Sequence, residues 1–540
     1  MIIYLKYNSI FSIILILFNC LSLHATTYSA NPSNYLSLRD NLVAGDTLLL
    51  TSGNYTNGLR LNGINGTPEK WIVIKSESLH ETVLLGRDGS NTMDITNCSY
   101  LKIEGIKFDG QMIPYIDAIK ASGSASNWAH HIWIHNNIIT RHDSDQQTVG
   151  ISTKIPCWDW TISHNKIMSA GTGIYLGNSD GSMPFIHGTI EYNLILNPVG
   201  YCMQIKHQND RLDLPGIPKT KSSTMVRHNV FAKNERPSSD GARPNVLFGG
   251  QTLNGAGTDD RVECYGNFFY NNPREFLLQA TGNVSVHHNI FVNSSSGAMN
   301  FQRHNSRDPK EVFIYNNSIN NVGTGVSITN PVKTEKQIIL ANAIFANIPI
   351  NAQSAADNLT GLINDADSYF NYPSSIIEEM DFYPRTGTPK ASVDYLFMEK
   401  DIDYDLDFNG NQMTISKYGA YSGEGINPGW KPALDIKGSG VTSVDEKIDI
   451  KSDIFVCPNP AQDDFTISGI NTDEIASIAL SDVLGNEVLK FNQSELKFNE
   501  AYNSIKIGKE NLSELCNGIY ILRVNSKRIL FKNVIIQILK

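Results

Sequence analysis

Charge is scarce in this chain, and basic charge is scarcer than acidic charge. Of the 540 residues, 44 are Lys or Arg and 54 are Asp or Glu, so the formal net charge is −10 and the charged fraction only 18%. An acidic chain without a protein-wide basic face is not expected to bind nucleic acid. Helix signals are also few, whereas the turn formers Asn and Gly are frequent, and this balance predicts an all-β fold.

Long apolar runs are missing after residue 25. Residues 1–25 carry Lys6, an apolar run from Ile10 to Phe18 and a small residue at Ala25, which is typical of an export signal. No later segment reaches the roughly 18 apolar residues of a spanning helix, so we expect no transmembrane segment in the mature chain. Cys20 leaves a lipoprotein as an alternative, although Asn19 fits a lipoprotein signal poorly. The protein is predicted to be secreted or held at the cell surface.

Cysteine pairs close in sequence are missing as well. No Cys-x-x-Cys occurs, which argues against zinc sites. Four of the cysteines are expected to be buried thiols, whereas the two C-terminal ones, Cys457 and Cys516, are candidates for a disulfide in an oxidising compartment. The four are Cys98, Cys157, Cys202 and Cys264.

One pattern recurs along the first two thirds of the chain: apolar-x-x-Asn-x-apolar. Its spacing runs from 22 to 38 residues, and an earlier copy has Ile106 in the Asn place. A period of this size with short β-like pieces predicts a solenoid, in which identical Asn side chains stack in a hydrogen-bonded ladder. The repeated asparagines are Asn137, Asn165, Asn193, Asn229, Asn267, Asn289, Asn317 and Asn342.

This repeat resembles the right-handed parallel β-helix of the pectate-lyase-like superfamily, over about residues 27–350. A capping helix is expected before a strand at Thr47 to Leu50, and the segments 405–412 and 418–430 are expected to cap the other end. The β-helix domain with its caps is placed at residues 26–437. The fold hosts lyases, hydrolases, epimerases and adhesins, so it does not fix the function.

The last residues have a different character. CPNPAQDDFTISG (457–469), ALSDVLGNEV (479–488) and LCNGIYILRV (515–524) resemble the type A C-terminal sorting domain of the type IX secretion system of Bacteroidetes. We place this domain at residues 454–540, after a polar linker at 438–453, and expect a small antiparallel β-sandwich. The resemblance implies that the type IX secretion machinery is a partner.

The second strand of each coil predicts a groove. If Ile151, Ile174 and Met203 point inward, the alternation of a strand places Tyr175 and Gln204 outward. The next outward column then contains Lys154 and Lys206, roughly 10 Å apart across two coils. Residues 201–244 also hold eight Lys or Arg against four acids, which favours an anionic ligand such as an acidic polysaccharide.

Uronate polysaccharides are cleaved by β-elimination, in which a base removes a proton and a cation neutralises the carboxylate. Lys206, with His207 and Arg211 nearby, is the candidate base, because a lysine near like charges has a lowered pKa. Lys154 or Arg243 is the candidate neutralising cation. The candidate substrate-binding residues are Tyr175, Gln204, Arg243, Asn178 and Gln302.

Several signatures of related enzymes are missing. The Asn-Thr-Asp, Asp-Asp, His-Gly and Arg-x-Lys set of polygalacturonase-like hydrolases does not occur, nor does the Arg-His-Gly signature of the chondroitinase B and alginate lyase group. The first hypothesis is a lyase that cleaves an acidic glycan. A non-catalytic glycan-binding or adhesion protein is the second, and a hydrolase or epimerase the third. Calcium is expected only by analogy, since no acidic cluster is dense enough to name a site.

Three structural roles are expected beside the groove. Arg227 stacks beside Glu191 and is expected to form an ion pair with it. Trp158 and Trp160 are expected to pack rather than bind sugar. His164, His228 and His288 precede ladder asparagines and are expected to stack.

Overall fold

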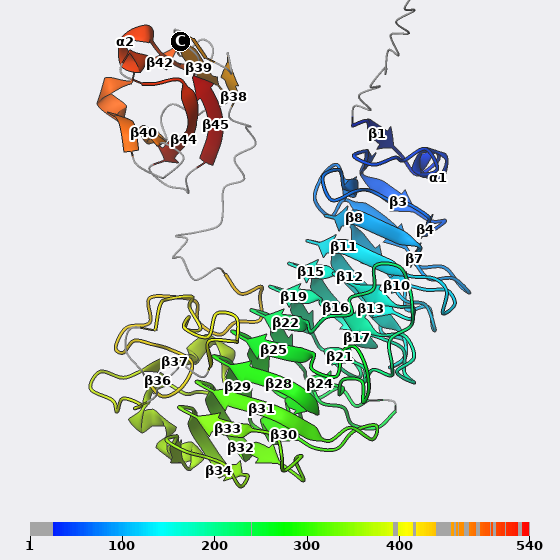
Figure 1. Cartoon of the computed structure of the whole chain (residues 1–540), viewed down its shortest axis with the longest axis vertical. Coiled ribbons are helices and arrows are strands. Elements are labelled where there is room, and N and C mark those ends of the chain that lie inside the picture. Colours follow the sequence, from blue (N-terminus) through cyan, green and yellow to red (C-terminus); the bar gives the residue numbers. More distant parts are fainter. Residues whose placement is uncertain are drawn as a thin grey trace, which may run out of the picture. The chain divides into compact units, whose positions relative to one another are not determined.

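A computed structural model describes residues 25–238, 240–392, 398–413 and 417–438, and most of 455–538 (Figure 1). In that last range the gaps are 458–460, 463, 469–474, 482–486, 497, 500–503, 514 and 527–531. The expected signal peptide and most of the expected linker lie outside the described residues. Contacts divide the chain into two compact units: one runs to residue 437 without 428–430, and the other holds those three residues and 438–540.

The first unit is a parallel β-helix, as the sequence predicts. Every strand pair in its first sheet is parallel, and each strand pairs with the strand of the next coil. The strands of this sheet are β1 (Thr27–Ala30), β2 (Thr47–Leu50), β5 (Ile72–Ser76), β8 (Cys98–Glu104), β11 (Ala129–His135), β14 (Cys157–Trp158), β15 (Thr161–Ser163), β18 (Phe185–Ile186), β19 (Thr189–Glu191), β22 (Ser223–Arg227), β25 (Arg261–Tyr265), β28 (Gly282–His287), β31 (Pro309–Tyr315) and β33 (Gln337–Leu340).

A second column of parallel strands follows the Asn position of each coil. It consists of β3 (Gly53–Tyr55), β6 (Thr82–Leu85), β9 (Lys107–Asp109), β12 (Ile138–His142), β16 (Lys166–Ala170), β20 (Leu194–Leu196), β23 (Val230–Ala232), β26 (Phe268–Tyr270), β29 (Ile290–Asn293), β32 (Ser318–Ile328), β34 (Ala343–Asn351) and β35 (Leu359–Gly361).

A third column carries the predicted groove. It consists of β4 (Leu59–Asn62), β7 (Met93–Thr96), β10 (Ile119–Ala121), β13 (Val149–Thr153), β17 (Thr172–Leu176), β21 (Met203–Ile205), β24 (Val246–Phe248), β27 (Leu278–Ala280) and β30 (Met299–Phe301), and it joins the second column through the long strands β32 and β34.

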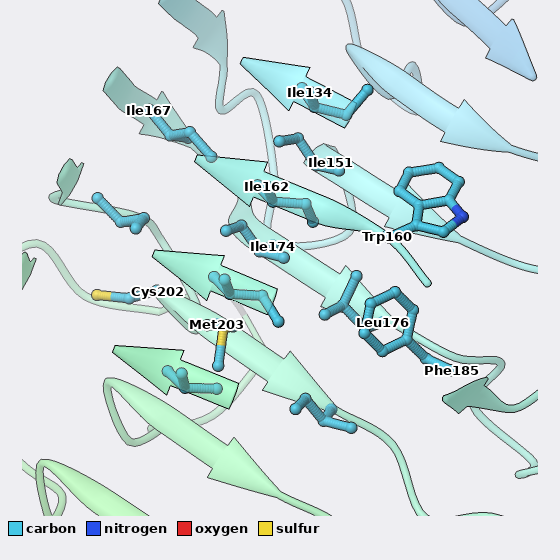
Figure 2. Packing of buried hydrophobic residues seen from close by; sticks show 14 of the residues in the cluster. Ile134, Ile151, Trp160, Ile162, Ile167, Ile174, Leu176, Phe185, Cys202 and Met203 are labelled. Carbon is cyan, nitrogen blue, oxygen red and sulfur yellow. The ribbon is translucent and has the colours of Figure 1, made fainter. Parts of the chain in front are cut away.

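The core consists mainly of aliphatic side chains stacked from coil to coil, with aromatic ones such as Trp160 and Phe185 among them (Figure 2). Ile134 lies against Ile162 in the first sheet, and Ile151, Ile174 and Met203 form a second stack in the third column. Each side chain is fully buried, and burying one such side chain contributes about 1.5–3 kcal/mol. The free cysteines Cys98, Cys157, Cys202 and Cys264 are buried, as expected.

The predicted asparagine ladder is present. Each Asn Nδ2 donates to the Oδ1 of the next ladder Asn at 2.9–3.1 Å, from Asn137 through to Asn342. The ladder continues by one rung to Asn358, which the sequence pattern missed because it follows Asn342 after only 16 residues. At the other end the backbone amide of Ile106 donates to Asn137.

The residue before each ladder Asn turns the chain with a left-handed backbone. His164, His228 and His288 have φ values of 58°, 56° and 51°. The rings of His164 and His228 stack on Tyr192 at 5.1 and 4.8 Å, as expected. The ring of His288 instead meets His287 and Tyr315 edge-on. The expected ion pair between Arg227 and Glu191 forms at 2.7 Å, and Trp158 and Trp160 are buried.

The N-terminal cap agrees with expectation: helix α1 (Tyr35–Arg39) precedes β2. The C-terminal end differs. The last coils are followed by η1 (Ile363–Ser368), β36 (Phe370–Tyr372), η2 (Ile377–Glu379) and β37 (Asp381–Pro384), and η1 packs against β34. Of the two segments expected to cap this end, residues 418–427 reach the last coils, whereas 405–412 lie along the flank, as described next.

Residues 398–413 and 431–437 run along the flank of the first sheet. Asp401 is buried and accepts hydrogen bonds from Arg261, Ser285 and Tyr315, which belong to three successive coils. The Lys437 ammonium donates to the carbonyls of Gly266 and Phe408 at 2.8 and 2.6 Å. These two segments form a flank cover, because these coils present outward polar side chains that need partners. Residues 417–420 instead contact the last coils: the Gly419 amide donates to the Ala341 carbonyl at 2.8 Å, and the Lys417 carbonyl accepts from Asn316 at 3.1 Å.

The second unit is the expected small antiparallel sandwich. One sheet contains β38 (Phe455–Cys457), β39 (Phe465–Ser468), β43 (Ser504–Ile507) and β42 (Phe498–Asn499). The other contains β41 (Glu487–Asn492), β40 (Ile475–Ser481), β44 (Gly518–Ser526) and β45 (Lys532–Ile538). Short helices η5 (Gln493–Glu495) and α2 (Lys509–Leu512) join them. Cys516 is a free, exposed thiol, so it forms no disulfide; the side chain of Cys457 lies outside the described residues.

Candidate functional site

The strand register places the predicted groove residues side by side. Ser152 pairs with Tyr175, and Tyr175 pairs with Gln204, on the outward face of β13, β17 and β21. At the end of β21, the amide of Lys206 donates to the Leu176 carbonyl at 2.8 Å. This bond continues the pairing of β17 with β21 by one residue, so Lys206 lies beside Gly177. The outward columns that the sequence predicts are therefore correct in this region.

These side chains line one groove of about 540 Å³, large enough for a small ligand or a few sugar units of a chain. Five predicted site residues line it: Lys154, Tyr175, Gln204, Lys206 and Arg243. Residues that the sequence reading did not name complete it: Tyr115, Asp117, Lys120, Gln146, Gln147, Val149, Thr172, Ser179, Tyr201 and Asp240.

Lys154 is the most perturbed cation of the groove. Its Nζ lies 3.3 Å from the centre of the Tyr175 ring, and it forms no ion pair within the described residues. Burial lowers the pKa of Lys154 to about 7, with further lowering by Lys120 and Lys206 and an opposing effect of Asp117. The neutral form of the Lys154 amine is therefore accessible at neutral pH, unlike that of an ordinary lysine.

Lys206 lies two coils further along the same column. Gly177 occupies the coil between them, and a β-carbon there would lie 3.3 Å from the Lys206 β-carbon, so the glycine leaves room for the lysine stem. Burial, and then the charge of Arg243, lowers the pKa of Lys206. Lys206 also has no ion pair in the part of the chain that the structure describes.

Two tyrosines and an arginine complete the polar lining. The Arg243 guanidinium lies 5.8 Å from the Tyr201 ring centre and pairs with Asp240 at 3.2 Å. Burial raises the pKa of Tyr175 to about 12, so its hydroxyl keeps its proton at neutral pH. The groove thus combines the Lys154 amine, whose pKa is lowered, with the basic side chains of Lys206 and Arg243 and the protonated phenol of Tyr175.

The carboxylates of the groove are already engaged. Asp117 accepts hydrogen bonds from the Val149 amide at 3.0 Å and the Ser152 hydroxyl at 2.7 Å, and it pairs with Lys120 at 3.2 Å. Asp240 pairs with Arg243 on the groove wall. Neither is free to act as one of the two carboxylates that hydrolysis of a glycoside needs.

One wall of the groove is a long loop tied across several coils. Residues 234–244 precede β24, yet Arg236 pairs with Asp143 in the loop before β13. The hydroxyl of Ser238 donates to Gln146, which also accepts from the Asp240 amide at 3.3 Å. These contacts hold Arg243 and Asp240 over the strands.

Four predicted site residues do not line the groove. Arg211 is buried and pairs with Asp260, and it donates to the Pro218 carbonyl at 2.5 Å, so its charge is used within the fold. His207 packs against Gly181, where an added β-carbon would lie 2.7 Å from its ring. Asn178 accepts from the Ser179 amide, and Gln302 lies three coils beyond Lys206.

The local excess of positive charge is largely neutralised by acids from outside the segment. Lys219, Arg236 and Arg243 form ion pairs, as do Arg211 and Arg227, and Lys233 donates to the Gly200 carbonyl. Lys206 is not among these paired side chains. The sequence count therefore overstates the free positive charge of the segment. Within the described residues, Lys206 in the groove and the exposed Lys221 outside it form no ion pair.

Lys120 and Asp117 were missed although their signal is in the sequence. Lys120 pairs with Ser152, so it extends the outward column of Ser152, Tyr175 and Gln204 by one coil. The Asn pattern fails in that coil, where Ile106 replaces the ladder Asn, so the column was not extended to it. Tyr115 and Gln146 lie in loops, whose positions no register fixes.

Comparison with known proteins identifies the second unit. Residues 455–537 match the family described as "Secretion system C-terminal sorting domain". These residues are a secretion sorting domain. The sorting domain indicates export to the cell surface or the medium, and it agrees in place and type with the domain expected from the sequence. No curated protein matches the chain.

The first unit is similar to several solved structures of low identity. The PL6 family alginate lyase AlyGC is 14% identical over 62% of this chain and 51% of its own, with a TM-score of 0.38, so the chain spans about half the length of that lyase. The GH136 lacto-N-biosidase from Eubacterium ramulus is 10% identical over 63% and 68%, with a TM-score of 0.45. The A-module of the Azotobacter vinelandii mannuronan C-5 epimerase AlgE4 is 12% identical over 60% and 93%, with a TM-score of 0.37.

Within the described ranges, no three His, Cys, Asp or Glu side chains come together as metal ligands. Among the same residues, no helix has the length and apolar character needed to span a bilayer. Calcium binding stays a prediction.

Proposed function

We propose that this chain binds an acidic polysaccharide in the groove and cleaves it by β-elimination. The observation that carries the proposal is the pair of unpaired lysines, one of which has a pKa of about 7 and lies against a protonated tyrosine. A general base works best when its pKa is near the operating pH. Lys154, rather than Lys206, therefore takes the role of the base.

The chemistry uses groups already in the groove. Lys206 and Arg243 remain cationic and hold the uronate carboxylate, which favours the charge that develops when the adjacent proton leaves. Neutral Lys154 takes the C5 proton, and the C–H electrons form the C4–C5 double bond. The C4–O bond breaks, and the Tyr175 hydroxyl gives its proton to the leaving oxygen. Water then restores the proton of Tyr175 and removes that of Lys154.

Hydrolysis is less well supported because the carboxylates of the groove, Asp117 and Asp240, are held by other groups. Export fits the proposal, because an exported protein can reach polysaccharides outside the cell. We also propose that the sorting domain engages the type IX secretion machinery, which rests on its family match.

The test is a panel of alginate, pectate and chondroitin incubated with the intact protein, with and without a calcium chelator. Unsaturated, ultraviolet-absorbing ends are expected from at least one polymer, and Lys154→Ala is expected to lower that rate by about 10²–10⁴-fold. Lys219→Ala, at an exposed lysine outside the groove, is the control and retains the rate.

Three other outcomes overturn the elimination mechanism. Cleavage without unsaturation indicates a hydrolase, and altered uronate stereochemistry without cleavage indicates an epimerase. Polymer binding without any product indicates the glycan-binding or adhesion protein. Loss of activity with the chelator adds calcium to the proposed site.

A further inference from the structure

Tyr115 combines an unfavourable backbone with an exposed side chain. It lies between β9 and β10 with a φ of 59°, in the left-handed region, and its side chain is 76% exposed. This region is disfavoured for residues with a β-carbon, and large exposed aromatic side chains gain nothing from burial to offset it. Backbone outliers of this kind concentrate at binding sites.

Other tyrosines with the same backbone have compensating contacts. Tyr192, with a φ of 51°, stacks between His164 and His228 at 5.1 and 4.8 Å. Tyr100, also at 51°, lies 4.4 Å from the ring of His131. For Tyr115 no ring contact occurs within the described part of the chain. Its conformation is therefore not explained by packing.

The loop around Tyr115 is firmly held. Ile116 is buried, and its carbonyl lies 3.3 Å from His142 Nδ1. Gln111 donates from its side chain to the Gly86 carbonyl at 2.8 Å, and the Met112 amide donates to the Arg141 carbonyl at 3.0 Å. These contacts fix the backbone on both sides of Tyr115 and hold the ring out at the groove.

Tyr115 lines the same groove as Lys120 and Lys154. The strand that follows it, β10, pairs with β13, so Tyr115 precedes the coil that carries the proposed base. The coil of Tyr115 therefore lies about 4.8 Å along the solenoid from the coil of Lys154.

We propose that Tyr115 is a stacking platform for a pyranose ring of the polysaccharide, which forms an outer subsite of the groove. An aromatic face offers a large apolar surface to the C–H face of a sugar, and the phenol hydroxyl can hydrogen-bond to a sugar hydroxyl. This inference rests on the proposed polysaccharide substrate. It adds that the protein prefers chains long enough to reach from Lys154 to Tyr115.

The test uses three variants of the full chain: Tyr115→Ala, Tyr115→Gly and, as a control, Met112→Ala. Met112 shares the loop, the left-handed backbone and exposure, but does not line the groove. On the polymer that is cleaved, both Tyr115 variants are expected to raise KM about 2- to 12-fold with kcat unchanged. On the shortest oligosaccharide cleaved, their KM is expected to equal that of the intact protein, and Met112→Ala changes neither.

The two Tyr115 variants also separate the ring from the backbone. Both lack the ring, but only glycine accepts the left-handed backbone freely. Tyr115→Gly is therefore expected to need more urea for unfolding than Tyr115→Ala, while the two share one KM. Equal urea midpoints, or a KM on the polymer that stays at the intact value, would overturn the inference.

Failure of this inference and of the proposed function give different results. Affinity electrophoresis in gels containing alginate, pectate or chondroitin measures retention without any catalysis. If Tyr115→Ala is retained more weakly than Met112→Ala, the stacking platform is supported, whatever Lys154→Ala does to cleavage. If Lys154→Ala leaves cleavage intact, only the proposed base is ruled out. Equal retention of both variants, with loss of cleavage in Lys154→Ala, removes only the platform.

Discussion

Replacement of Lys206 by Gln is expected to move the pH dependence of cleavage, because Lys206 lies near the proposed base. In the intact protein only neutral Lys154 accepts a proton, so kcat/KM rises with pH through about 7 and then reaches a plateau. The charge on Lys206 lowers the pKa of Lys154. Its removal raises that pKa, and the ascending limb moves to higher pH.

The size of this movement follows from the register. The two lysines lie two coils apart, or roughly 10 Å at about 4.8 Å per coil. Two unit charges at that distance interact by about 1.7 kcal/mol at an effective dielectric constant of 20, and by about 0.5 kcal/mol with full salt screening. Since 1.36 kcal/mol corresponds to one pH unit, the limb moves upward by about 0.3–1.2 pH units.

The assay is the initial rate of formation of unsaturated ends, measured at low substrate so that it reports kcat/KM of the free protein. Lys219→Gln is the matched control, because this lysine lies outside the groove and pairs with Asp213. The control keeps the original limb. A limb at the same pH in Lys206→Gln, or one that persists in Lys154→Ala, would refute Lys154 as the base.

Three further outcomes are expected. Asn229→Ala removes an interior ladder rung and leaves buried donors unpaired, so it is expected to lower the unfolding free energy by about 2–5 kcal/mol in urea denaturation. Gly177 has a φ of 91°, and an added β-carbon there would crowd the stem of Lys206, so Gly177→Ala is expected to lower the rate of polymer cleavage. Gly177→Asn is expected to be more stable than Gly177→Ala in urea denaturation, because Asn tolerates this backbone better. Arg211→Met breaks the buried ion pair with Asp260 and is expected to lower the unfolding free energy by about 3–5 kcal/mol. The added change Asp260→Leu is expected to restore that stability. If Arg211→Met lowers activity without lowering stability, the structural role of Arg211 is contradicted.

The solenoid was predictable because one side chain marks the same place in every coil. With the ladder asparagines aligned, strand alternation fixed Met203 as inward and Gln204 as outward, and the pairing agrees. The prediction failed where that mark was absent. The coil of Lys120 has Ile106 in the Asn place, and its column was not extended.

The site was only partly predictable because loops follow no register. Arg211 lies five residues after Lys206, yet its partner Asp260 is 49 residues away and draws it out of the groove. The choice between Lys154 and Lys206 as the base also depended on burial, which the alternation of side chains along a strand does not show. The Tyr175 ring covers Lys154 and buries it, so the lower pKa belongs to the lysine expected to be the neutralising cation.

The flank cover has a mechanical consequence. Lys437 is buried, and its side-chain amine donates to the carbonyls of Gly266 and Phe408. A force applied to the chain beyond Lys437 is therefore received first by these buried bonds, at the side of the solenoid. They must break before the load reaches residues 417–420, which contact the last coils.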